Sequence, residues 1–182
     1  LLMNILENQF HLFPQEKFFA EELKSQYPNA HADGKTGQPD IIIPEIEKEI
    51  ECKITSKGKS GGWSLQTDYN TLGSKGSLDY LYVLCSPQFD KFSVLYFEDL
   101  DVSDFRNPSP GSRGKSQMVL WKAMKKCTVL WGKVENISDE NREKVAKLIA
   151  GNPSSYDMKK LIKRKKFWNT TPDRFRFVLE GI

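Results

Sequence analysis

The stretches QPDIII (residues 38–43) and EIECKIT (residues 49–55) decide the fold of this 182-residue chain. Three consecutive isoleucines predict a short buried strand, and the strict alternation in the second stretch predicts a strand with two different faces. The face expected to lie against a core carries Ile50, Cys52 and Ile54. The opposite face is expected to carry Glu49, Glu51, Lys53 and Thr55.

A hairpin that joins these two strands would place Asp40 beside Glu51 and Lys53. Two carboxylates a few ångströms apart suit Mg²⁺, which takes one or two carboxylates and keeps several waters. A neighbouring lysine can hold a metal-activated water and offset the charge that develops on a phosphate. These side chains therefore predict phosphodiester hydrolysis. The alternative interpretation is a surface hairpin with solvated charges.

The order Pro-Asp, a gap of ten residues, then Glu-x-Lys resembles the PD-(D/E)xK nuclease superfamily, to which most type II restriction endonucleases belong. The resemblance covers roughly residues 14–86. It implies an α/β (α+β) fold with a mixed sheet and an αβββαβ core, followed here by C-terminal helices.

The resemblance also implies roles for individual residues. Asp40, Glu51 and the carbonyl of Cys52 would bind Mg²⁺, and Lys53 would position or activate the attacking water. A glutamate of the first helix would assist beside the metal. Glu22 is the candidate for that role, with Glu16 and Glu21 as alternatives and a solvated helix charge as the other interpretation.

The elements around the motif follow from periodicity. Residues 10–27 predict a helix with one apolar stripe, and residues 65–72 predict a short helix capped by Ser64 and ended by Gly73. Residues 78–85 predict a central strand that pairs antiparallel with a strand at 92–97. The remaining strand of the core is expected at 29–32 or is absent.

The C-terminal part predicts a strand at 127–131, two helices and a closing strand at 174–180. Ser138 is expected to cap the first of these helices, and the second is expected to begin near Ser155. The residues expected to face inward from these helices are Val145, Leu148, Ile149, Met158, Leu161 and Ile162.

Composition limits the class of protein. The chain has 38% hydrophobic and 28% charged residues, which fits a globular protein, and no apolar run approaches the ~20 residues needed to span a bilayer. Three dispersed cysteines and two histidines form neither a zinc spacing nor a disulfide framework. These features predict a reducing, cytoplasmic setting, prokaryotic if the resemblance holds, with no membrane contact.

Charge is unevenly distributed along the chain. Residues 1–105 carry nine Lys/Arg against seventeen Asp/Glu, whereas residues 106–133 carry seven Lys/Arg and no acid. Residues 153–182 carry eight Lys/Arg against three Asp/Glu. An acidic half that holds a metal and a basic half that binds phosphates suit a nuclease. Ordinary surface variation is the alternative.

Three basic segments are candidates for DNA contact: the Gly-rich stretch after the motif, the loop at 107–117, and the second C-terminal helix. Arginine commonly reads guanine and glutamine reads adenine, and flexible cations suit phosphate oxygens. The candidate DNA-binding residues are Lys57, Lys59, Arg113, Lys115, Gln117, Lys159, Lys160, Lys163 and Arg164. The alternatives are a linker for the first segment, a solvated surface loop for the second and a solvated basic face for the helix.

The sequence thus predicts one nuclease domain over residues 1–182, with a catalytic core at about 10–100 and a basic part at about 101–182 for DNA contact and dimerisation. The expected activity is Mg²⁺-dependent, site-specific cleavage of double-stranded DNA by a homodimer. The alternatives are a Holliday-junction resolvase, repair nuclease or exonuclease of the same fold, and a non-catalytic DNA-binding protein.

Overall fold

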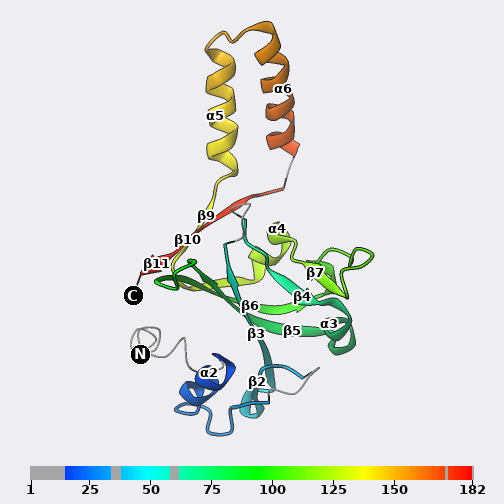
Figure 1. The fold of residues 1–182 in the computed structure, drawn as a ribbon, viewed down its shortest axis with the longest axis vertical. Coiled ribbons are helices and arrows are strands. Elements are labelled where there is room, and N and C mark those ends of the chain that lie inside the picture. Colours follow the sequence, from blue (N-terminus) through cyan, green and yellow to red (C-terminus); the bar gives the residue numbers. More distant parts are fainter. Residues whose placement is uncertain (1–14, 34–37, 58–61, 171, 182) are drawn as a thin grey trace. The chain divides into compact units, whose positions relative to one another are not determined.

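A computed structural model describes residues 15–33, 38–57, 62–170 and 172–181 (Figure 1). The chain divides into two compact units, one made of residues 1–133 with 179–182 and the other of residues 134–178. The sequence predicts a single domain whose basic part begins near residue 101, whereas the two units divide at residues 133/134. No described helix combines the length and the apolar character needed to cross a bilayer.

The first unit is built on a seven-stranded sheet. The sheet is mixed, as the sequence predicted. Its order is β1-β2-β3-β5-β6, and β6 then pairs along its far edge with both β8 and β11. β3 and β5 are parallel, whereas the β1/β2, β2/β3 and β5/β6 pairs are antiparallel. The strands are β1 (His31–Ala32), β2 (Ile41–Ile43), β3 (Lys48–Ser56), β5 (Ser77–Cys85), β6 (Lys91–Asp101), β8 (Cys127–Trp131) and β11 (Glu180–Gly181).

The hairpin predicted between the two motif stretches is confirmed. A 3₁₀ turn, η1 (Pro44–Ile46), joins β2 to β3, and Glu47 follows it in the left-handed conformation with φ 52°. This connection explains why the sequence lacks the Asn-Gly signal of a tight two-residue hairpin. The short strand predicted at 29–32 is also present, as β1.

Because β3 and β5 are parallel, the chain must cross over between them, and the helix in this connection is shorter than predicted. Residues Gln66–Asp68 form β4, which pairs with β7 (Lys115–Gln117), so they are not available for a helix. The helix is α3 (Tyr69–Lys75), capped by Asp68 and ended by Gly76 at φ 85°. The predicted helix over 65–72, with Ser64 as cap and Gly73 as end, is therefore wrong in its bounds.

The two faces of this sheet differ in what covers them. α2 (Gln15–Leu23) lies on the face that carries Ile41, Ile50 and Cys52. The other face carries Tyr80 and Tyr82, whose hydroxyls contact Thr67 Oγ1 and the Gln66 carbonyl of the β4–β7 ribbon. β5 is buried on both faces, as predicted for a central strand. Ile54 is 40% exposed, so its predicted core position is wrong.

A buried carboxylate stabilises the middle of the sheet. Asp79 on β5 is 3% exposed and lies 3.0 Å from the Lys48 ammonium. Asp79 Oδ1 accepts the backbone N–H of Asp99 at 2.9 Å, and Oδ2, the oxygen beside Lys48, also accepts the Tyr96 hydroxyl. The hydrogen bond that the Lys48 ammonium donates to Asp79 raises the pKa of Lys48 and so favours its charged form.

Short elements complete the first unit between β6 and β8. They are η2 (Val102–Asp104), α4 (Leu120–Ala123) and η3 (Met124–Lys126). Asp104 is buried, and its Oδ2 lies 2.7 Å from the Lys126 ammonium. This pair ties η2 to η3 and uses one of the cations of the acid-free stretch 106–133.

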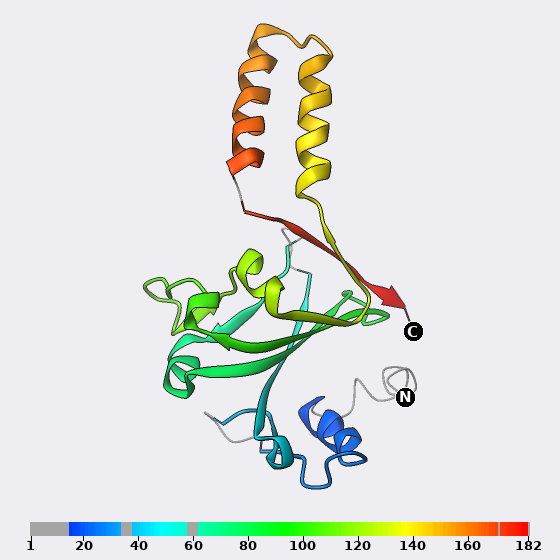
Figure 2. The same ribbon diagram turned by 180° about the vertical axis from the view of Figure 1, so that it is seen from behind.

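The second unit is a helical hairpin joined to a two-stranded ribbon (Figure 2). Its elements are β9 (Lys133–Asn136), α5 (Ser138–Ala150), α6 (Ser155–Thr170) and β10 (Phe175–Val178). Ser138 is not the predicted cap: its hydroxyl accepts the Arg174 N–H at 2.8 Å, while Asn136 Oδ1 accepts the Ser138 N–H.

Two predicted core positions of this unit are wrong, because Leu148 and Ile162 are more than half exposed. Leu161 and Val145 are buried as predicted. The strand predicted over 174–180 divides into β10, which pairs with β9, and β11, which pairs with β6.

Candidate active site on β3

The Asp40 side chain is hydrogen-bonded to the β3 backbone within the motif. β2 and β3 pair with Ile41 opposite Ile50, so the residue before Ile41 lies opposite Glu51. Asp40 Oδ2 accepts the backbone N–H of Cys52 at 2.7 Å. One carboxylate oxygen is thereby fixed to the strand between Glu51 and Lys53, and the other remains as a potential ligand.

Glu51 and Lys53 lie on the same face of β3 and form an ion pair. Their side chains are partly buried, with 20% of Glu51 and 34% of Lys53 exposed. Burial raises the pKa of Glu51, the Lys53 ammonium opposes this effect, and the charges of Asp40 and Asp68 add to it. The structure therefore brings together three of the predicted catalytic residues, Asp40, Glu51 and Lys53.

Asp68 is a neighbouring acid that the sequence analysis did not identify. It ends β4, its charge contributes to the raised pKa of Glu51, and its Oδ1 accepts the Thr71 N–H at 3.0 Å as the cap of α3. Hydrogen bonds from that helix end lower the pKa of Asp68 itself. The available signal was an aspartate directly before a short helix, which is a preferred capping position.

Glu22, the predicted assisting glutamate, lies elsewhere. It lines a hollow of about 550 Å³ on the α2 face of the sheet, here called the apolar groove, together with Ile43, Ile46 and Tyr96. Glu16, one of the alternatives, acts electrostatically on the motif: burial raises the pKa of the Cys52 thiol, and the charges of Asp40, Glu51 and Glu16 raise it further.

A second hollow lies on the face of the sheet that points away from α2, between β3 and the β4–β7 ribbon, and Lys53 lines it. Its volume is about 250 Å³, and we call it the polar cleft. Lys115 lies opposite Asp68 in the ribbon and shares the cleft with Lys53. The residues that line the polar cleft are Lys53, Ile54, Thr55, Ser64, Gln66, Thr67, Tyr82 and Lys115.

The predicted DNA-contacting loop at 107–117 therefore ends in a strand that lies next to the site. Lys115 reaches the polar cleft, whereas Gln117 Oε1 accepts a hydrogen bond from Ser64 Oγ at 3.2 Å. Arg113 is exposed and has a left-handed backbone with φ 52°. Gly114 follows at φ 78°. A Cβ added at Gly114 would lie 3.7 Å from Asp68 Oδ2, so this turn runs close to Asp68.

The other predicted DNA-binding residues that the structure describes are exposed. Lys57 directly follows β3, and Lys59 lies outside the described residues. On α6, all four candidates are exposed, and the Lys160 ammonium lies over the Tyr156 ring at 5.1 Å. The α6 candidates are Lys159, Lys160, Lys163 and Arg164.

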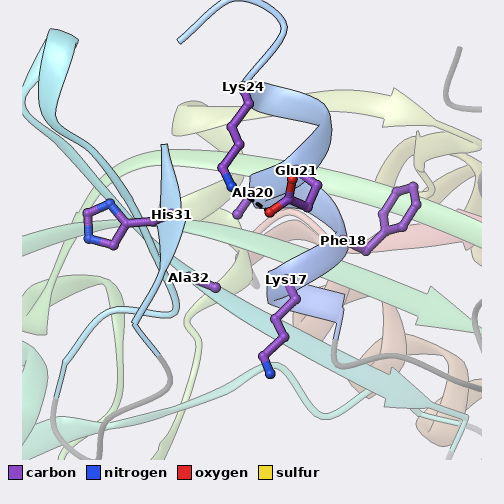
Figure 3. A pocket seen from close by; sticks show the side chains of 7 residues that line it. All are labelled: Lys17, Phe18, Ala20, Glu21, Lys24, His31 and Ala32. Atoms are coloured by element: carbon purple, nitrogen blue, oxygen red, sulfur yellow. Dashed lines mark hydrogen bonds and ion pairs between the residues drawn. The ribbon is translucent and has the colours of Figure 1, made fainter. Parts of the chain in front are cut away.

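A hollow between α2 and β1 is a poorer candidate for chemistry (Figure 3). It is about 530 Å³ in volume and contains one carboxylate, Glu21, which is paired with Lys24 at 2.5 Å. His31 is exposed there, and its Nδ1 contacts the Asn29 carbonyl. Among the described residues that line this hollow, no second carboxylate lies beside the first, in contrast to the paired acids on β3.

The chemistry of the β3 site fits a magnesium ion better than a metal held by protein alone. Among the described residues, no three His, Cys, Asp or Glu side chains gather closely enough to enclose a metal. Mg²⁺ does not need such a cage, because it usually takes one or two carboxylates and completes its shell with water and substrate phosphate. Asp40 and Glu51 supply those carboxylates.

Comparison of the sequence with known protein families and with curated proteins found no match to either.

Proposed function

We propose that this protein is a Mg²⁺-dependent DNA endonuclease of the PD-(D/E)xK type, most similar to a type II restriction endonuclease. The observation that carries the proposal is the hydrogen bond from the Cys52 N–H to Asp40, which sets one acid of the motif against the strand that bears the other acid and the lysine.

The order of elements supports the proposal. α2, β1, β2, β3, α3 and β5 follow one another as helix, three strands, helix and strand, if the short ribbon strand β4 is set aside. This is the αβββαβ order that the resemblance implies. The motif lies on the second and third of these strands, where a rigid sheet holds its side chains.

Each side chain then has a role. Asp40 Oδ1, Glu51 and the Cys52 carbonyl would hold Mg²⁺, and a metal bound there would supply charge to polarise the phosphate and to lower the pKa of a coordinated water. Lys53 is tied to Glu51, and it positions the water and offsets the negative charge that develops at phosphorus. The catalytic contribution of Glu22 is not supported by its place at the apolar groove.

DNA affinity comes from cations outside this cluster. The exposed lysines and arginine of α6 attract the phosphate backbone regardless of sequence, and Arg113 and Lys115 add cations in the unit that holds the β3 site. A homodimer is the expected form if the recognised sequence is a palindrome, because two-fold symmetric DNA calls for two-fold symmetric protein.

The test is digestion of supercoiled plasmid with Mg²⁺ and with EDTA, for wild type, Asp40→Asn, Lys53→Ala and Glu49→Gln. Glu49 is the matched control because it lies on the same strand and pairs with Lys75 instead of taking part in the site. Wild type and the control should cut with Mg²⁺ alone, and the two site variants should not. Equal cutting by all four proteins, or none by wild type, contradicts the proposal.

The products separate the alternatives. Discrete fragments indicate sequence recognition, whereas degraded ends indicate an exonuclease and junction-only cutting indicates a resolvase. A non-catalytic DNA-binding protein is the remaining alternative, and the row of exposed cations on α6 favours it. Such a protein would bind DNA with an affinity that falls with salt and is indifferent to Asp40→Asn.

A further inference from the structure

The polar cleft contains more cationic and hydrogen-bonding groups than the catalytic roles above require. Lys53 belongs to the catalytic cluster, but Lys115 comes from the opposite wall, on β7. Both Ser64 and Gln66 are exposed at this cleft, and Thr55 adds a hydroxyl. The cleft is therefore a polar hollow with an ammonium group on each side.

The charge of this region depends on whether a cation is bound. Asp40, Glu51 and Asp68 oppose the two ammonium groups of Lys53 and Lys115, so three carboxylates face two cations. A divalent cation at Asp40 and Glu51 reverses that balance, because it adds two positive charges. It also competes with Lys53 for Glu51, which leaves the Lys53 ammonium available to an anion.

We propose that the polar cleft binds a phosphate group of the nucleic-acid backbone next to the one that is cleaved, with Lys115 as its main cation, and that a divalent cation at Asp40 and Glu51 strengthens this binding. The proposal rests on the nuclease function proposed above. It makes Lys115 a substrate-positioning residue instead of a general contributor to DNA affinity.

The ribbon is built to hold Lys115 in this place. In the antiparallel register of β4 and β7, Gln66 lies opposite Gln117 and Asp68 lies opposite Lys115. The Tyr82 hydroxyl donates a hydrogen bond to the Gln66 carbonyl at 2.9 Å. These bonds fix the ribbon to the sheet that carries Lys53. The side chain of Lys115 is exposed and long, so it can reach a phosphate oxygen without moving the ribbon.

The experiment uses thymidine 5′-monophosphate as the probe, because it has one phosphate group and no phosphodiester bond that a nuclease could cleave. Binding is followed from the backbone amide shifts of Gln66, Thr67, Lys115 and Ser116 in ¹⁵N-labelled protein, with Mg²⁺ and with EDTA. Thymidine without phosphate is the ligand control. The variants are Lys115→Gln, Lys115→Arg and, from the same acid-free stretch, Lys122→Gln, whose ammonium contacts the Ser103 carbonyl instead.

We expect the cleft amides to shift with the monophosphate and not with thymidine, and the affinity to be about threefold or more higher with Mg²⁺ than with EDTA. Lys115→Gln should weaken binding by about three- to tenfold, which is the range for one exposed charge-assisted contact. Lys115→Arg should restore most of the affinity because it keeps the charge, and Lys122→Gln should bind as wild type does.

Unchanged affinity in Lys115→Gln, shifts confined to other residues, or equal binding with Mg²⁺ and EDTA would overturn the proposal. These outcomes are separate from a failure of the proposed function. If plasmid is cut while Lys115→Gln binds the monophosphate normally, only the cleft proposal fails. If the cleft binds phosphate through Lys115 but no plasmid is cut, the nuclease function fails and the phosphate site stands.

Discussion

The β3 site and helix α6 both carry charges that the sequence marks as functional, but the structure holds them in opposite ways. Asp40, Glu51 and Lys53 are partly buried and bonded to one another or to the strand backbone. On α6, Lys159, Lys163 and their neighbours are exposed along a helix. The first arrangement fixes a few atoms in place, and the second spreads charge over a surface.

This difference teaches how the two regions can contribute. A reaction needs groups held to fractions of an ångström, which a sheet backbone provides through bonds such as that from Cys52 to Asp40. Attraction of a polyanion needs net charge more than fixed geometry. Loss of one group should therefore be severe on β3 and gradual on α6.

The largest effect is expected from removing a group of the β3 site. Lys53→Ala should lower the cleavage rate by about a thousandfold, within the range observed for loss of a positioned proton-transfer or charge-stabilising group. DNA affinity in EDTA should change little, since α6 retains its charges. Plasmid cleavage and fluorescence anisotropy measure the two quantities. A large loss of affinity with little loss of cleavage would reverse the assigned roles of the two regions.

Stability provides the next largest contrast. Asp79→Ala removes the partner of Lys48, the Tyr96 hydroxyl and the Asp99 N–H, and should lower the free energy of unfolding by about 3 kcal/mol. Lys163→Gln should change it by less than about 0.5 kcal/mol, because an exposed charge on a helix face contributes little. Urea denaturation measures both. Equal effects would show that Asp79 is not the buried anchor described here.

A smaller and graded effect is expected on α6. Replacing Lys159, Lys160, Lys163 and Arg164 together with glutamine should weaken DNA binding at low salt by tenfold or more. The slope of log affinity against log salt should fall by up to about four, since each phosphate contact contributes about 0.9. Single substitutions should give fractions of this loss. An unchanged slope in the quadruple variant would remove α6 from the DNA-binding surface.

The sequence predicted the strands of the sheet better than the elements between them. Alternation and apolar runs specified β2, β3, β5 and β6, because burial on one or both faces imposes those patterns directly. Residues 65–72 were predicted as a helix from a Ser64 cap and a Gly73 end, but Gln66–Asp68 instead pair with Lys115–Gln117, about fifty residues away. A pairing at that distance leaves no local signal, so neither the ribbon nor the polar cleft was foreseen.

The candidate site shows the same limit. Asp40, Glu51 and Lys53 were brought together by the register of one hairpin, which local pattern and a familiar motif can predict. Glu22 and Asp68 depend on how α2 and β4 lie against the sheet. The spacing of glutamates along α2 does not say which one faces the motif. It selected Glu22, which lines the apolar groove, although the charge of Glu16 acts on the Cys52 thiol.

The smallest effect concerns the stability cost of the site itself. Burial raises the pKa of Glu51 above its value in the unfolded chain. Folding therefore moves the ionised carboxylate into a less favourable environment, which lowers the free energy of unfolding. The sign follows by linkage: this penalty is absent below the unfolded pKa, grows as pH rises through the folded pKa, and is complete above it. Glu51→Gln should therefore raise the melting temperature in EDTA at pH 7.5, and the difference from wild type should shrink toward pH 4.

Glutamine keeps an oxygen that can accept from Lys53, so the variant tests the charge and not the contact. Glu49→Gln is again the control, since Glu49 is a half-exposed acid on the same strand. A Glu51→Gln protein that melts below wild type at pH 7.5 would show that the ion pair with Lys53 outweighs burial. In that case the β3 site would be stabilising in its own right, and the contrast with α6 would lie in geometry alone.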